Sequence, residues 1–244
     1  MKWPQIISRF SFRKRSFGKF VCLIGFGLLL QHVSAQSISK DIRIEFVPLW
    51  GEQKLLLNCP LSFGDKDTLI VEKLRWYISG VKLKQGIRTV FEDSEKARLL
   101  DAGDSGTLTF KMKLGETEAW DALVFNAGID SQTNCSGALT GDLDPVKGMY
   151  WTWQSGYINT KIEALSMGGK EWQLHLGGYR EPFACIRNMV LETPVDTAVL
   201  TVGLNLKLLM EKARKEQINR TMQPGKNAFD LSNEWAKGFK LMRP

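Results

Sequence analysis

Two tryptophans and two tyrosines stand within ten residues in the stretch MYWTWQSGYI, residues 149–158, which contains no charged residue. As one strand, the stretch places Trp151, Trp153, Ser155 and Tyr157 on the same face. The rings then form either a packed aromatic ladder, in which each buried ring hides about 150–250 Å², or a site of oxidation or modification. Trp153 is the stronger candidate for that site, because it lies deeper in the expected strand than Trp151 and shares a face with Tyr157.

A metal site is the second chemistry to consider, and it centres on His175 in the segment WQLHLGG. Copper(I) prefers imidazole and sulphur ligands, so His175 could bind copper together with Met149, Met167 or Cys185, with Trp153 close by. One imidazole makes a poor copper site without sulphur. The alternative is a partly exposed histidine, because alternation places His175 on the more polar face of its strand and a loop could accept its hydrogen bond.

A loop of 20 residues, 129–148, leads directly into the aromatic stretch. Loops longer than about 12–15 residues are usually functional or disordered. Asp130, Asn134, Asp142 and Asp144 offer the hard oxygen ligands that calcium requires, but their spacing is not that of an EF-hand. Turns capped by Asp and Asn side chains explain the same residues, so calcium is the disfavoured interpretation.

Three cysteines follow the first 35 residues, and an odd number leaves one thiol over in an oxidising compartment. Cys135 and Cys185 are the expected disulfide, because both lie in or beside the loops that flank the aromatic strand. Cys59 is then free. The chain has no CxxC motif, which argues against a thiolate zinc site or a haem attachment site.

The first 35 residues have the pattern of a secretory signal peptide, with cleavage expected before Gln36. Six basic residues precede an apolar run, residues 20–30, that is too short for a membrane span of roughly 20 residues. The whole chain has 33 basic and 26 acidic residues, and the leader contains six of the basic residues and none of the acidic ones. The rest of the chain therefore has 27 basic and 26 acidic residues. The nearly neutral charge after the leader gives no evidence for nucleic-acid binding. The signal peptide predicts a periplasmic or secreted location.

The elements that must position these residues are mostly strands. Apolar residues alternate in several segments, which predicts an all-β, single-domain β-sandwich. The segments are residues 41–50, 68–83, 107–114, 120–125, 150–163, 171–176 and 197–204. Only residues 206–219 and 229–239 look helical, so we expect a short helical C-terminal segment. The domain is expected over residues 37–222, with a tail, residues 223–244, that packs against it.

No enzyme constellation is evident in the sequence. After the leader, a catalytic triad would have to use His175, and no G-x-S-x-G or other nucleophile motif accompanies it. We therefore expect a protein that is not an enzyme.

Five segments resemble the MbnP-like family of secreted proteins. They are FVPLWGEQKL, LRWYISGVKLK, FNAGIDSQTNCSGALTGDLDPVKGMYWTWQSGYINTKIEA, LHLGGY and MQPGKNAFDLSNE. The resemblance implies a secreted β-sandwich linked to copper handling, sometimes paired with a di-haem peroxidase-like enzyme that oxidises a tryptophan to kynurenine. Trp151 and Trp153 are the candidates for that position. Related copper proteins combine the modified tryptophan with histidines, whereas this chain has one histidine after its leader.

Three hypotheses follow, in order of preference. The first is copper handling, or a role as the redox partner of a di-haem peroxidase-like enzyme. The second is a non-catalytic β-sandwich that binds an organic ligand or a protein partner through its long loop and exposed aromatic rings. The third is a secreted enzyme that depends on His175 or on a carboxylate of the loop.

Overall fold

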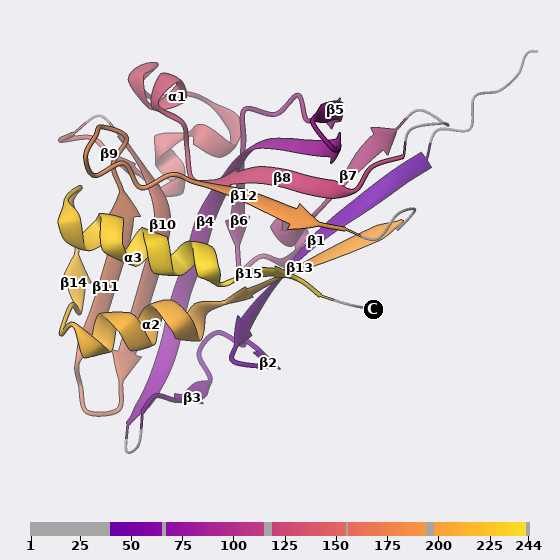
Figure 1. Ribbon diagram of the computed structural model, residues 1–244. Coiled ribbons are helices and arrows are strands. Elements are labelled where there is room, and N and C mark those ends of the chain that lie inside the picture. The colour runs from indigo at the N-terminus through magenta and orange to yellow at the C-terminus, as the bar shows by residue number, and fades with distance from the viewer. Residues whose placement is uncertain (1–39, 65–66, 115–118, 155, 194–197, 243–244) are drawn as a thin grey trace, which may run out of the picture. The chain divides into compact units, whose positions relative to one another are not determined.

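The computed structural model describes residues 40–64, 67–114, 119–154, 156–193 and 198–242. The expected signal peptide and its cleavage position before Gln36 lie outside these residues. Among the described residues, no helix is long and apolar enough to cross a membrane. The fold is all-β, as predicted, and its strands form two sheets (Figure 1).

The smaller sheet is built around the alternating segment that begins at Lys40. Ile42, Ile44 and Phe46 of β1 are fully buried or nearly so, because successive side chains of a strand point to opposite faces. β1 pairs in parallel with β13 and antiparallel with β7, and β15 and β2 lie at the edges. The strands of this sheet are β1 (Lys40–Trp50), β2 (Gln53–Lys54), β7 (Thr109–Leu114), β13 (Val199–Asn205) and β15 (Phe239–Leu241).

The larger sheet is organised by one long strand, β4, which pairs with β10 along its first half and with β8 along its second. The order through the sheet is β12-β8-β4-β10-β11-β14, with four further short strands attached. Its members are β3 (Pro60–Ser62), β4 (Thr68–Gln85), β5 (Arg88–Glu92), β6 (Ala97–Asp101), β8 (Ala122–Ala127), β9 (Tyr150–Trp151), β10 (Gly156–Ser166), β11 (Glu171–Gly177), β12 (Arg187–Glu192) and β14 (Arg220–Thr221).

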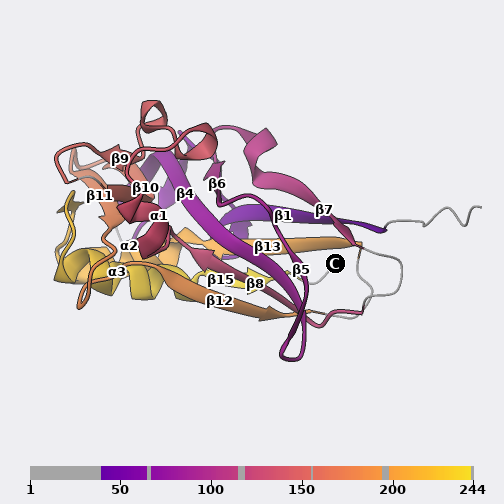
Figure 2. The same cartoon turned by 90° about the horizontal axis from the view of Figure 1, so that it is seen from above.

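Helices occupy the loops and the C-terminal part. Residues 129–148 contain α1 (Ser131–Cys135) and the 3-10 turns η2 (Gly141–Leu143) and η3 (Pro145–Lys147), and η1 (Ser105–Leu108) precedes β7. The two predicted helices are α2 (Leu206–Lys215) and α3 (Lys226–Lys237). Figures 1 and 2 show α2 and α3 side by side near β10 and β11, and the two helices contact each other.

The expected tail is part of the main core rather than an addition to its surface. Ala228, Leu231 and Trp235 of α3 are buried in the same cluster as the strand residues. Trp235 packs edge-to-face on Trp76 with ring centroids 6.1 Å apart, and Phe239 brings β15 into the smaller sheet. No structural break therefore occurs at residue 222.

The aromatic stretch is not one strand. β9 ends at Trp151, the chain turns, and β10 begins at Gly156 and runs back antiparallel, pairing Gly156 with Trp151 and Tyr157 with Tyr150. Residue 155 lies outside the described part. The hairpin separates residues that alternation had placed on a shared face, so the expected depth order of the two tryptophans is wrong.

Candidate functional site

The two tryptophans of the hairpin lie next to each other in very different surroundings. Trp151 is 6% exposed, whereas Trp153, in the turn, is 64% exposed. Their ring centroids are 5.9 Å apart with the planes tilted by 44°. The expectation that Trp153 lies deeper than Trp151 is therefore wrong, because Trp153 is the outer ring and Trp151 the inner one. Together the rings form a continuous aromatic path from the surface to the buried side of the hairpin.

Glycines make room for this aromatic group. A Cβ on Gly177 of β11 would lie 2.7 Å from Cζ3 of Trp151, so the indole rests on the glycine backbone. On the other strand of the hairpin, a Cβ on Gly156 would lie 3.3 Å from the ring of Tyr179. These contacts join the hairpin to the end of β11 and to the segment that follows it.

Beneath the hairpin, Trp151 belongs to a second hydrophobic cluster that is separate from the main core. The cluster contains Tyr77, Ala97, Leu99, Ile129, Leu143, Met149, Trp151, Tyr157 and Ile158. Tyr157 stacks edge-to-face with Tyr77 at 5.9 Å and with Tyr150 at 4.9 Å. Burial raises the pKa of both Tyr77 and Tyr157, so both phenols stay protonated at neutral pH.

The long loop is held over this cluster by hydrogen bonds to buried side chains. The Tyr157 hydroxyl accepts from the Leu139 N–H at 3.0 Å and lies 3.0 Å from the Leu143 carbonyl, to which it can donate. Tyr77 donates to the Asp142 carbonyl at 2.8 Å. Arg75 donates to the carbonyl of Lys147 at 3.1 Å. The loop is therefore an ordered cover for the inner side of the hairpin.

The four oxygen-bearing residues of the loop make hydrogen bonds within the protein. Asp130 caps α1 by accepting from the N–H and the hydroxyl of Thr133. Asp144 caps η3 by accepting from the Val146 N–H. These are the capping turns given above as the alternative to calcium.

The other two residues of this set link the loop to the sheet. Asn134 donates to the carbonyls of Ile129 and Asp130 and accepts from the N–H of Tyr157. Asp142 accepts from the Leu99 N–H at 3.0 Å and from the Lys147 ammonium at 2.7 Å. All four side chains thus position the loop.

His175 is buried, at 4% exposure, and not partly exposed as expected. Its Nε2 lies 3.3 Å from Oε1 of Glu163, and its Nδ1 is buried without a hydrogen-bond partner. Burial, reinforced by the positive charge of Lys161, lowers the pKa of His175, so the ring is neutral at neutral pH. Donation from Nε2 to the carboxylate would leave Nδ1 with a free lone pair.

Glu163 is the charged partner that the sequence did not single out. It pairs with Lys73 at 2.6 Å and with Lys161 at 3.4 Å in addition to His175. Burial raises the pKa of Glu163, but the hydrogen bond from Lys73 and the charge of Lys161 outweigh this, and the net pKa is lowered. Glu163 is therefore ionised and orients the imidazole.

The donors proposed for copper do not form a complete ligand set. Among the described residues, no group of three or more His, Cys, Asp and Glu side chains could hold a metal ion. Met149 is fully buried in the second cluster, whereas Met167 is 73% exposed in the turn after β10. The indole nitrogen of Trp153 carries a hydrogen and has no lone pair with which to bind a metal. Cys185 donates its thiol hydrogen to the Gly177 carbonyl at 3.1 Å. Of the donors proposed for copper that the structure describes, His175 therefore offers a buried nitrogen lone pair without a complete set of partners, and these unmodified residues do not fit a copper ion.

The predicted disulfide is absent from the structure, in which Cys59, Cys135 and Cys185 are all free. Cys135 is exposed at the end of α1. Cys185 is buried in the main core, and its thiol lies 3.1 Å from the carbonyl of Gly177. The prediction is wrong because Cys135 lies on the surface and Cys185 in the main core, and flanking the same stretch in the sequence does not give two thiols the geometry that a disulfide requires.

A comparison with protein-family models matches the MbnP family over residues 39–226. This match covers most of the chain. The chain belongs to the MbnP family. The long segment that carries the resemblance in the sequence contains the loop, the hairpin and most of β10, which together build the site described above.

The fold of this MbnP-family chain resembles that of a solved structure, MbnP from Methylosinus trichosporium. The TM-score is 0.53 at 17% sequence identity, and the match covers 71% of this chain and 78% of the other. At this identity the likeness supports the shared fold alone. A comparison with curated proteins found no match.

Proposed function

We propose that this MbnP-family protein is a secreted redox partner of a haem peroxidase-like enzyme, which oxidises its hairpin tryptophans. The observation that carries the proposal is the pair formed by Trp153 and Trp151. An exposed ring can lose an electron to a docked haem protein without the haem entering the core. The buried ring of Trp151, whose centroid lies 5.9 Å from that of Trp153, is close enough to pass an electron to the oxidised outer ring.

Conversion to kynurenine is the modification that we propose for Trp153. Two molecules of hydrogen peroxide, used by the haem enzyme, supply one oxygen atom each to C2 and C3 of the indole and leave as two waters. The C2–C3 bond breaks and gives N-formylkynurenine. Water then releases C2 as formate, so the residue gains about 4 Da. Trp153 is favoured over Trp151 because its ring is open to oxygen donors.

The proposal contains no copper step. His175 provides one free imidazole nitrogen, and no group of three or more His, Cys, Asp and Glu side chains in the described part of the chain completes a ligand set around it. We expect a Cu(I) competition titration of the unoxidised protein to give weak binding that is the same in wild type and His175→Gln. Tight binding that is lost in His175→Gln would show that the unmodified chain assembles a copper site after all.

Rapid kinetics test the redox role. The haem-loaded partner is oxidised with one equivalent of peroxide and mixed with this protein, and its return to the resting spectrum is followed. Wild type should accelerate the return, and Trp153→Phe should reduce that acceleration by at least about tenfold. Trp50→Phe is the matched control, because Trp50 is buried in the smaller sheet and packs on Phe63. Equal rates for wild type and Trp153→Phe would reject the proposal.

A further inference from the structure

A recess of about 180 Å³ lies beside the tryptophan hairpin. Gln154, which follows Trp153 directly, forms one wall, and Tyr179, Arg180, Phe183 and Pro224 form others. Close contacts hold these walls together, since a Cβ on Gly178 would lie 3.1 Å from both the Phe183 carbonyl and Cβ of Pro224. The hairpin, the segment after β11 and the loop before α3 therefore make one surface.

The side chains around this recess are of the kinds that dominate protein interfaces. Trp153 is 64% exposed and Phe183 is 38% exposed. Arg180 is exposed, and its guanidinium lies over the ring of Tyr179 at 5.4 Å from the centroid. Tryptophan, tyrosine and arginine are enriched among the residues that contribute most to binding energy. We call Trp153, Tyr179, Arg180 and Phe183 the docking surface.

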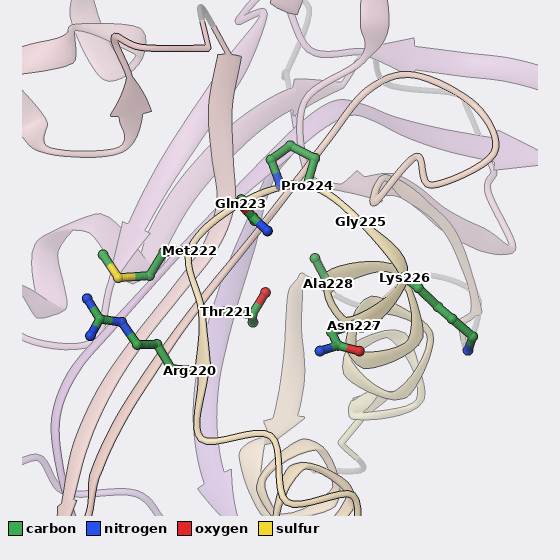
Figure 3. Close-up of a pocket in the computed structure, with 9 residues that line it drawn as sticks. All are labelled: Arg220, Thr221, Met222, Gln223, Pro224, Gly225, Lys226, Asn227 and Ala228. Carbon is green, nitrogen blue, oxygen red and sulfur yellow. The ribbon is translucent and has the colours of Figure 1, made fainter.

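A second, larger groove of about 470 Å³ extends this surface (Figure 3). It shares Pro224 and Gly225 with the recess and is lined by residues 220–228. In Figure 3 the side chains of Arg220 and Lys226 extend on opposite sides of the loop, whereas Thr221, Gln223 and Asn227 lie between them.

The charge of the two grooves is predominantly positive. Arg180, Arg220 and Lys226 line them, against one acidic residue, Glu181. Lys226 is paired with Asp230. Arg180 and Arg220 are both exposed, and neither forms an ion pair with a carboxylate of the described residues. Two guanidinium groups are thus free to meet carboxylates of a partner, and arginine binds carboxylates through paired hydrogen bonds.

We propose that the docking surface, together with Arg220, binds an acidic face of the haem protein that oxidises Trp153. This inference rests on the proposed function and specifies the chemistry of the partner. In this arrangement, carboxylates of the partner face Arg180 and Arg220, and Trp153 contacts the partner from the hairpin that borders the recess. Opposite charges on the two faces speed diffusional encounter more than they increase final affinity, so the arginines chiefly control the association rate.

Direct binding measurements test the surface without any chemistry. The resting, haem-loaded partner is immobilised without peroxide, and association of wild type and of the double variant Arg180→Glu/Arg220→Glu is followed at low and high salt. We expect the double variant to associate at least about tenfold more slowly at low salt and to lose most of its dependence on salt. Lys111→Glu/Lys113→Glu is the matched control with the same change in charge, because both are exposed lysines on β7 of the smaller sheet.

A hexaglutamate peptide provides a second probe of defined chemistry. It should compete with the partner for wild type and, in NMR titrations, should shift the signals of Arg180, Arg220 and the Trp153 indole. Equal association rates for wild type and the double variant, or peptide shifts confined to other surfaces, would overturn the docking surface. Binding that depends on Arg180 and Arg220 without oxidation of Trp153 would support the surface and reject the redox role, so the two proposals fail separately.

Discussion

The indole of Trp151 rests on the backbone of Gly177, where a side chain of any size would collide with it. A Cβ at this position would lie 2.7 Å from Cζ3 and 2.9 Å from Cη2 of the ring, and 2.7 Å from the carbonyl oxygen of Tyr157. Real Cβ atoms essentially never make such short contacts. The contact between these two residues therefore fixes the inner ring of the tryptophan pair.

Gly177→Ala should displace Trp151 and destabilise the protein by about 1–3 kcal/mol, because the added methyl group overpacks a closed site. Urea unfolding measures the loss, and the tryptophan emission spectrum should shift to the red. Gly168→Ala is the control, since the nearest neighbour of a Cβ there is Oγ of Ser166 at 3.7 Å. Identical stabilities for the two variants would show that Trp151 is not held in this way.

Tyr157→Phe should loosen the loop over the second cluster. The hydroxyl accepts from the Leu139 N–H at 3.0 Å, and leaving that N–H without its partner should cost about 1–3 kcal/mol. Hydrogen exchange should become faster at Leu139. Tyr150→Phe serves as the comparison, because its hydroxyl makes no hydrogen bond to the described residues while its ring packs on Tyr157. Unchanged exchange at Leu139 in Tyr157→Phe would contradict the proposed anchoring.

His175 should make stability depend on pH in a defined direction. Burial lowers its pKa in the folded state below the ordinary value of 6.5, so the unfolded chain binds the proton more tightly. Stability is then complete above about pH 6.5 and falls as the pH decreases below that value. Urea unfolding at pH 5.0 to 7.5 should show this decline in wild type and a smaller one in His175→Gln. The same slope in both proteins would exclude His175 as its cause.

The free thiols should differ sharply in reactivity. Cys135 is exposed and should react quickly with a thiol reagent in the folded protein, whereas burial raises the pKa of Cys185 and shields its sulphur. We expect Cys185 to react only after unfolding. Peptide mapping under non-reducing conditions provides the direct check, and a peptide that links Cys135 to Cys185 would reinstate the disulfide.

Most of the sheet structure could be predicted from the sequence because alternation reports burial directly. Residues 41–50 and 171–176 became β1 and β11 with small changes at their ends. The hairpin turn could not be found in this way. The turn residues that the structure describes, Thr152 to Gln154, include no glycine, proline or asparagine, which are the residues that mark most tight turns.

The candidate site was harder to predict because its surroundings come from distant parts of the chain. The polar neighbours of His175 in sequence suggested an exposed face, but the loop reaches this part of the sheet, where Lys161 donates to the carbonyl of Gly148. Glu163 and Gly177 have no distinctive local pattern. Their roles depend on the pairing of β10 with β11, which places Lys161 opposite His175 and Ile158 opposite Gly177.

Peptide mass analysis after reaction with the haem partner and peroxide tests the central claim most directly. Trypsin should release residues 148–161 as one peptide that contains both tryptophans, and fragment ions on either side of Thr152 separate them. The account predicts a gain of about 4 Da on Trp153, which is absent when the partner or peroxide is omitted and when the substitution Trp153→Phe is present. An unchanged mass for both tryptophans after the partner has turned over would contradict it.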